Sequence, residues 1–222
     1  MVTSSTRNGS DSLSSSLTDL MTSLMVIFVL LLVATWHNAA AKGESTRNLI
    51  LDKLSQELQR FAQKGVSVEK DPADPLGLLV VVPEGLLNFA VDRTEIPEGG
   101  LTFLSDFSPT LARTACSDKY RKEISSIVVE GHTDSTGTDE HNLQLSQERS
   151  LAVVQRTLDI LGRKEPEDKA CFLDFLSANG RGSKELIRDE NGNEDRDKSR
   201  RVVFKIRVRS FEPQLIQIIP SK

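Results

Sequence analysis

Asp134 and Arg149 are the residues whose types and spacing offer the most specific chemistry in this sequence. Asp134 ends a stretch that is expected to be a strand, and Arg149 lies 15 residues later, on the helix that should follow. A guanidinium binds a carboxylate through two parallel hydrogen bonds, and a carboxylate binds an amine. Brought together at the edge of a sheet, the two side chains would hold a zwitterionic ligand. The alternative is that they pair with each other and only fix the turn.

A second acid, Asp19, lies at the entrance of the only long apolar run, residues 17–41. About 20 apolar residues cross a bilayer as a helix, and an acid on such a helix is costly enough to suggest a function. Asp19 could bind and release an ion, with Thr22 and Ser23 on the same helical face supplying hydroxyl oxygens. The alternatives are that Asp19 caps the helix and that the hydroxyls bond to the helix's own carbonyls.

The apolar run could instead be a cleaved signal peptide, because Ala39–Ala41 resembles a cleavage site. The segment before the run is not basic, however, and the run is longer than a usual signal core. The sequence therefore favours a retained membrane anchor.

The remaining reactive residues form no catalytic pattern. Cys116 and Cys171 lack metal-ligand spacing, although a disulfide between them is allowed if they lie outside the cytoplasm. His132 is interpreted as a structural turn residue. The sequence holds no catalytic triad, zinc spacing or phosphate loop, and its net charge of −4 gives no basic field for nucleic acid. We expect a binding protein and not an enzyme, with no cofactor or resident metal and no nucleic-acid partner.

The pattern of apolar residues predicts an α+β domain. Strands are expected at 66–69, 78–82, 124–130, within 172–178 and at 202–208, and helices at 101–111 and 140–161. Residues 86–89 are expected to continue the second strand, and Gly162 to end the second helix. This order of elements places helices on one side of a mixed sheet.

The chain divides into five expected segments. They are a disordered tail at 1–16, a transmembrane helix at 17–41, a juxtamembrane helix or linker at 42–66, the folded domain at 67–210 and a C-terminal tail at 211–222. Residues 43–45 offer a break after the membrane helix. The juxtamembrane segment carries one apolar stripe, which packs either on its own domain or on a second copy of the chain. The stripe consists of Ile50, Leu54, Leu58 and Phe61.

Residues 129–149 and 176–208 together resemble the OmpA-like peptidoglycan-binding domain. The family pattern is Gly-His-Thr-Asp-x-x-Gly, then Asn-x-x-Leu-Ser-x-x-Arg, then a strand ending Gly-x-Gly, then a strand with paired arginines. The matching positions are Gly131, His132, Thr133, Asp134, Gly137, Asn142, Leu145, Ser146, Arg149, Gly180, Gly182, Arg200 and Arg201. The resemblance covers roughly residues 76–210.

This resemblance implies a periplasmic domain that holds the diaminopimelate side chain of the wall peptide. The implied ligand contacts are Asp134 and Arg149, with Thr133, Asn142 and Arg201 nearby. The sequence departs from the family at Ser199, where the family has Asn, and it lacks the usual proline after Gly182. These departures predict weaker binding or an altered pocket.

A single span that begins with an acid and leads to an OmpA-like domain resembles the B subunit of MotA/MotB-type stators. The matching stretch is DLMTSLMVIFVLLL, which begins at Asp19. The short linker and the Ser-rich N-terminus are most similar to ZorB of Zorya anti-phage systems. The alternatives are a flagellar MotB-type subunit and a wall-binding membrane protein without motor activity.

The stator resemblance implies an ion-driven motor in the bacterial inner membrane. The N-terminus would be cytoplasmic and the C-terminal domain periplasmic. Asp19 would carry the transported proton or sodium ion. The implied partners are a multi-span A-type subunit similar to ZorA or MotA, a second copy of this chain, and peptidoglycan.

Overall fold

The computed structural model describes residues 9–87, 89–90 and 92–209. The chain forms two compact units, Met1–Lys42 and Gly43–Lys222, which are considered separately. Helix α1 (Gly9–Glu57) contributes residues to both. It is already helical over residues 9–16, which were expected to be disordered, and it continues through residues 43–45, where a break was expected. Residues 1–8 and the expected tail at 211–222 lie outside the described residues.

The first unit holds one helical segment long and apolar enough to cross a membrane, Leu17–His37. Its 21 residues are all exposed in the isolated chain. A helix that exposes apolar side chains around its whole circumference suits a lipid environment better than water.

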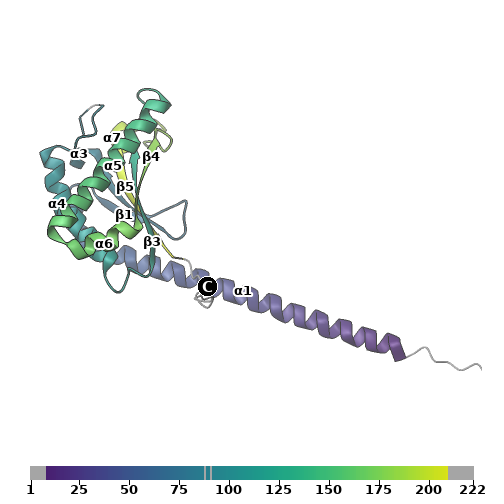
Figure 1. The fold of residues 1–222 in the computed structure, drawn as a ribbon. Helices are drawn as coiled ribbons and strands as arrows, with labels where there is room; N and C mark the ends of the chain where they lie inside the picture. Colours follow the sequence, from purple (N-terminus) through teal and green to yellow (C-terminus); the bar gives the residue numbers. More distant parts are fainter. Residues whose placement is uncertain (1–8, 88, 91, 210–222) are drawn as a thin grey trace, which may run out of the picture. The chain divides into compact units, whose positions relative to one another are not determined.

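The second unit is built on a five-stranded mixed sheet with the strand order β1-β2-β5-β3-β4 (Figure 1). Its strands are β1 (Ser67–Lys70), β2 (Gly77–Pro83), β3 (Ile124–His132), β4 (Leu176–Gly182) and β5 (Arg201–Val208). Only β3 and β4 run parallel, and the other neighbouring pairs are antiparallel. The expected mixed sheet is thus confirmed.

The longer helices of this unit cover one face of the sheet (Figure 1). They are α4 (Glu98–Cys116), α5 (Asp139–Lys164) and α6 (Pro166–Phe175). The short helices are α2 (Gln59–Ala62), α3 (Glu84–Leu87) and α7 (Arg196–Ser199). Helices α5 and α6 form the crossover that a parallel β3–β4 pair requires.

Three sequence-based boundaries need correction. Residues 84–87 form α3 instead of extending β2, because Pro83 suits the start of a helix and cannot donate in a continuing ladder. Residues 172–175 belong to α6, which begins at Pro166, and β4 starts only at Leu176. Helix α5 also passes Gly162 and ends at Lys164.

The apolar stripe at residues 50–61 packs on the domain itself. Ile50, Leu54, Leu58 and Phe61 are 1–4% exposed and belong to the core. Phe61 makes edge contacts with Phe103 and Phe107, whose ring centroids lie 5.6 and 5.8 Å away. The stripe is therefore not available to pair with a second copy of the chain.

The end of α4 is joined to α6 by a disulfide between Cys116 and Cys171, whose Cα atoms lie 6.0 Å apart. The described residues include no free cysteine.

Candidate ligand-binding site

Asp134 lies just beyond the end of β3, in a loop held by its own hydrogen bonds. The Thr136 amide donates to Oδ1 of Asp134 over 2.9 Å. From the first turn of α5, Nδ2 of Asn142 donates to the backbone oxygens of Asp134 and Thr136 over 3.4 and 3.0 Å. Gly137 adopts a φ of +94°, a backbone conformation that favours glycine. The motif around Asp134 therefore fixes the loop and leaves Oδ2 of the carboxylate for a charged partner.

That partner is Arg200 and not Arg149. Nη1 of Arg200 lies 2.7 Å from Oδ2 of Asp134. The same guanidinium reaches Oε2 of Glu84 over 2.5 Å through Nε, and Oδ1 of Asp197 over 2.6 Å through Nη2. Arg200 thus gathers carboxylates from three separate segments of the chain.

Arg149 projects from α5 and is only 6% exposed. Its Nη1 donates to Oε1 of Glu84 over 3.0 Å. Its Nε and Nη2 donate to the backbone oxygens of Arg93 and Ala90, each over 3.1 Å. The guanidinium carbon also lies 4.9 Å from the centre of the Phe89 ring. Asp134 and Arg149 are therefore linked indirectly, in a chain of charges that we term the ionic network: Asp134, Arg200, Glu84 and Arg149.

The ionic network shifts the pKa values of Asp134, Arg200 and Arg149. Burial alone would raise the pKa of Asp134, but the hydrogen bonds from Arg200 and Thr136 outweigh burial and lower it. The hydrogen bond to Asp134 raises the pKa of Arg200 further above its ordinary value. Burial lowers the pKa of Arg149, opposed by the charge of Glu84.

Arg201 does not take part in the ionic network through any contact found among the described residues. Its Nη1 donates to the backbone oxygens of Glu185 and Ser199, each over 3.1 Å. Thr133 is 4% exposed, and its amide donates to the backbone oxygen of Gly182 over 3.0 Å. Of the five expected ligand contacts, Asp134 and Arg149 thus belong to the ionic network. Asn142 and Thr133 support the loop that carries Asp134. Arg201 makes its contacts outside the network.

Among site residues, sequence reasoning named neither Glu84 nor Arg200, which complete the ionic network, and the ligand contact expected at Arg201 stays a prediction. The alternation of side chains along β5 could have distinguished Arg200 from Arg201. Side chains alternate along a strand, and Val202 and Phe204 face the helices, so Arg201 must face the opposite side of the sheet. Arg200 lies one residue before β5 and does not face the same side as Arg201. No local pattern pointed to Glu84, which lies 65 residues from Arg149 in the sequence.

Ser199, which replaces the family's Asn, is fully buried. Its Oγ accepts a hydrogen bond from the Ile187 amide over 2.9 Å. Ser199 therefore ties the segment at Ile187 to the end of α7, just ahead of the arginine pair.

A groove of about 860 Å³ lies beside the segment whose backbone oxygens hold Arg149. Its lining includes Ala90 and Arg93, whose carbonyls hold Arg149, and Arg156 of α5. None of the four network residues lines this groove.

In the first unit, Asp19, Thr22 and Ser23 are all exposed in the isolated chain. Oγ1 of Thr22 lies 3.0 Å from the backbone oxygen of Thr18 and 2.9 Å from that of Asp19. The Thr22 hydroxyl therefore bonds to carbonyls of its own helix, as the simpler interpretation expected.

Comparison with known proteins gives one family match, two similar proteins and one similar solved structure. The OmpA family model matches residues 88–200, about half of the chain. A Zorya protein ZorB from Escherichia coli (Crooks strain) is 30% identical, with the alignment covering 92% of this chain and 91% of that protein. A second Zorya protein ZorB, from Escherichia coli O139:H28, is 29% identical over 64% of this chain and 58% of its own length. 

Among solved structures, a MotB-like protein from Desulfovibrio vulgaris superposes with a TM-score of 0.53 at 20% identity. The superposition covers 79% of this chain and 98% of that protein. This likeness concerns the fold alone.

Proposed function

Because the chain belongs to the ZorB family and carries an OmpA-family domain, we propose that it is the peptidoglycan-anchoring B subunit of an ion-driven motor in the bacterial inner membrane. The observation that carries the anchoring role is the ionic network. It gathers two carboxylates and two guanidiniums at the end of β3.

A diaminopimelate side chain carries an amine and a carboxylate on one carbon, so it needs an acid and a base held close together. Asp134 accepts the amine, and its lowered pKa keeps it ionised at neutral pH. Arg200, whose side chain is 33% exposed, provides the donors for the carboxylate, and Glu84 links it to the buried Arg149. The groove along Arg93 and Arg156 accommodates the rest of the peptide.

Sedimentation with purified peptidoglycan tests the anchoring role. Asp134→Asn keeps the shape of the side chain and removes its charge, so we expect the variant to stay in the supernatant. Asp118→Asn, the same change at an exposed position away from the network, is the matched control and should sediment like the wild type. Equal sedimentation of all three proteins would remove Asp134 from the binding site.

The motor role rests on the candidate span Leu17–His37 and on Asp19 near its start. We place the N-terminus in the cytoplasm and the OmpA-like domain in the periplasm. Asp19 then binds and releases a proton or sodium ion, within a complex of a multi-span A-type subunit and a second copy of this chain. The wall anchor holds the B subunit still while the ion flow moves its partner.

Phage challenge of cells that carry the complete system tests the motor role. Asp19→Asn should abolish protection while the protein remains inserted in the membrane and bound to the wall. Asp52→Asn, an exposed position further along α1, is the control and should protect normally. Full protection by Asp19→Asn would refute the ion-carrying role, and a loss of swimming instead of protection would assign the chain to a flagellar stator.

A further inference from the structure

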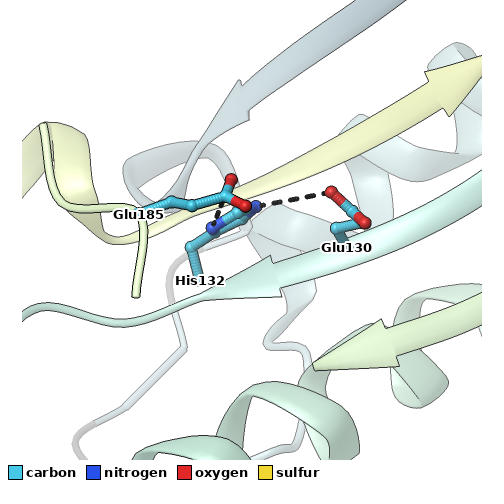
Figure 2. Close-up of side chains that lie close together, drawn as sticks. All are labelled: Glu130, His132 and Glu185. Carbon is cyan, nitrogen blue, oxygen red and sulfur yellow. Dashed lines mark ion pairs between the residues drawn. The ribbon is translucent and has the colours of Figure 1, made fainter. Parts of the chain in front are cut away.

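Glu130, His132 and Glu185 lie close together (Figure 2), and none of the three belongs to the ionic network. Gly131 faces α5, because a Cβ atom there would lie 2.2 Å from the Ser146 backbone oxygen. Its neighbours on β3, Glu130 and His132, therefore point to the opposite face of the sheet. Glu185 reaches the same place from the segment that follows β4. We term these three residues the carboxylate–imidazole cluster.

The imidazole at the centre of this cluster is buried and has no hydrogen-bond partner. His132 is 4% exposed, and within residues 9–87, 89–90 and 92–209 neither Nδ1 nor Nε2 finds a donor or acceptor. Burying polar atoms without partners is costly, and it is rare in native proteins. A ligand for one of the ring nitrogens would remove that cost.

Both carboxylates offer an oxygen to the ring. Oε2 of Glu130 lies 4.0 Å from Nε2 of His132, and Oε2 of Glu185 lies 3.9 Å from Nδ1. These separations exceed hydrogen-bond distance. One ligand atom from each of the three residues can be chosen so that all lie within 4.8 Å of one another.

The other oxygen of each carboxylate is already held. Oε1 of Glu130 accepts from Nδ2 of Asn179 over 3.3 Å, and Oε1 of Glu185 accepts from Nε of Arg181 over 3.0 Å. Outer hydrogen bonds of this kind orient the ligands of metal sites and are part of their design. They leave the two free oxygens directed at the imidazole.

The chemistry of the cluster selects a class of ion. One nitrogen and two carboxylate oxygens suit Zn²⁺ and related transition metals, whereas Ca²⁺ and Mg²⁺ prefer oxygen ligands alone. The buried imidazole of His132, which has no hydrogen-bond partner among the described residues, supplies the nitrogen ligand. Arg181 and Arg201 also offset part of the carboxylate charge, so we expect weaker binding than at a structural zinc site.

We propose that Glu130, His132 and Glu185 bind one divalent transition metal ion of the Zn²⁺ class. One ring nitrogen and one oxygen of each carboxylate are the ligands, and water completes the coordination. Zinc–ligand distances are about 2.0–2.2 Å, so the three side chains must close around the ion by small rotations. The bound ion would join the end of β3 to the segment after β4.

Calorimetric titration of the untagged full-length chain in detergent, stripped of metal beforehand, tests the proposal with Zn²⁺ as the probe. We expect one equivalent to bind, and an excess of Mg²⁺ not to displace it. Glu185→Gln should weaken binding by at least about tenfold. Its side chain is 43% exposed, so this variant should fold even if a change at the buried His132 does not.

Two matched controls accompany this variant. Glu190→Gln makes the same change at an exposed position, and His141→Gln removes an exposed histidine that pairs with Asp92. Both should bind Zn²⁺ like the wild type. Absence of a stoichiometric site in the wild type, displacement by Mg²⁺, or undiminished binding by Glu185→Gln would each overturn the proposal.

Discussion

Nε of Arg200 lies 2.5 Å from Oε2 of Glu84, although 116 residues separate them in the chain. The other oxygen of Glu84 binds Arg149, so one carboxylate joins two arginines that the sequence motif presents separately. Glu84 thereby sets the position of both guanidiniums before any ligand arrives.

We expect Glu84→Gln to lower the free energy of unfolding by about 1–3 kcal/mol, because Arg149 then loses the charged partner of a buried group. Urea denaturation of the purified protein measures the change. Glu190→Gln, at an exposed site, should be indistinguishable from the wild type. A neutral outcome for Glu84→Gln would mean that Arg149 is satisfied by its two backbone acceptors alone.

The juxtamembrane stripe gives a second prediction. Leu54 is 1% exposed, so Leu54→Ala should destabilise the domain by about 2–5 kcal/mol through lost contacts and a cavity. Leu49 lies on the same helix and is 51% exposed, so Leu49→Ala should have little effect. Urea denaturation measures whether the stripe stabilises its own domain, and cross-linking measures whether it pairs with a second copy of the chain. Both are carried out on each variant. A loss of dimers without a loss of stability at Leu54 would restore the pairing role.

The disulfide gives a third prediction. Cys116 and Cys171 are 55 residues apart, and closing a loop of that size removes enough unfolded-chain entropy to stabilise the fold by about 4 kcal/mol. The double variant Cys116→Ser, Cys171→Ser should unfold at a correspondingly lower urea concentration. Reductant should lower the wild type to the same midpoint and leave the double variant unchanged. A wild type that is insensitive to reductant would show that the bond is not formed in solution.

Acid stability gives a fourth prediction. Nζ of Lys205 lies 2.6 Å from Oδ2 of Asp71, whose side chain is 4% exposed. Burial alone would raise the pKa of Asp71, but Lys205 and the Ala73 amide outweigh burial and lower it. A carboxyl group whose pKa is lower in the folded state stabilises the fold above its ordinary value of about 3.9, and this contribution is lost as the pH falls through the lowered pKa.

Asp71→Asn should therefore be less stable than the wild type at neutral pH, and the difference should shrink below about pH 4. Unfolding curves between pH 7 and pH 2 measure it. The exposed Asp118→Asn should run parallel to the wild type throughout. A difference that stays constant down to pH 2 would show that Asp71 does not titrate with a lowered pKa.

The parts of the fold that sequence predicts are those that local periodicity encodes. The alternation of Val202, Phe204, Ile206 and Val208 predicted β5 and its buried face, and all four are at most 3% exposed. Helix α6 was missed because Cys171 and Phe172 fit a strand as well as a helix, and only the tertiary packing decides between them.

The site was predictable only where a motif carries it. The loop around Asp134 follows from residues close in sequence, whereas its pairing with Arg200 and the role of Glu84 depend on which strand ends meet at one edge of the sheet. The carboxylate–imidazole cluster was hidden for the same reason. Glu185 lies 53 residues after His132, at a spacing that no metal motif uses.

The disulfide also bears on what a protease can do to this domain. The bond closes a covalent ring through residues 116–171, and that ring contains all of β3, the Asp134 loop and all of α5. A single cut in the loop between β3 and α5 would leave the two pieces joined through Cys116 and Cys171. The nicked chain would run as one species on a non-reducing gel and separate into two only after reduction.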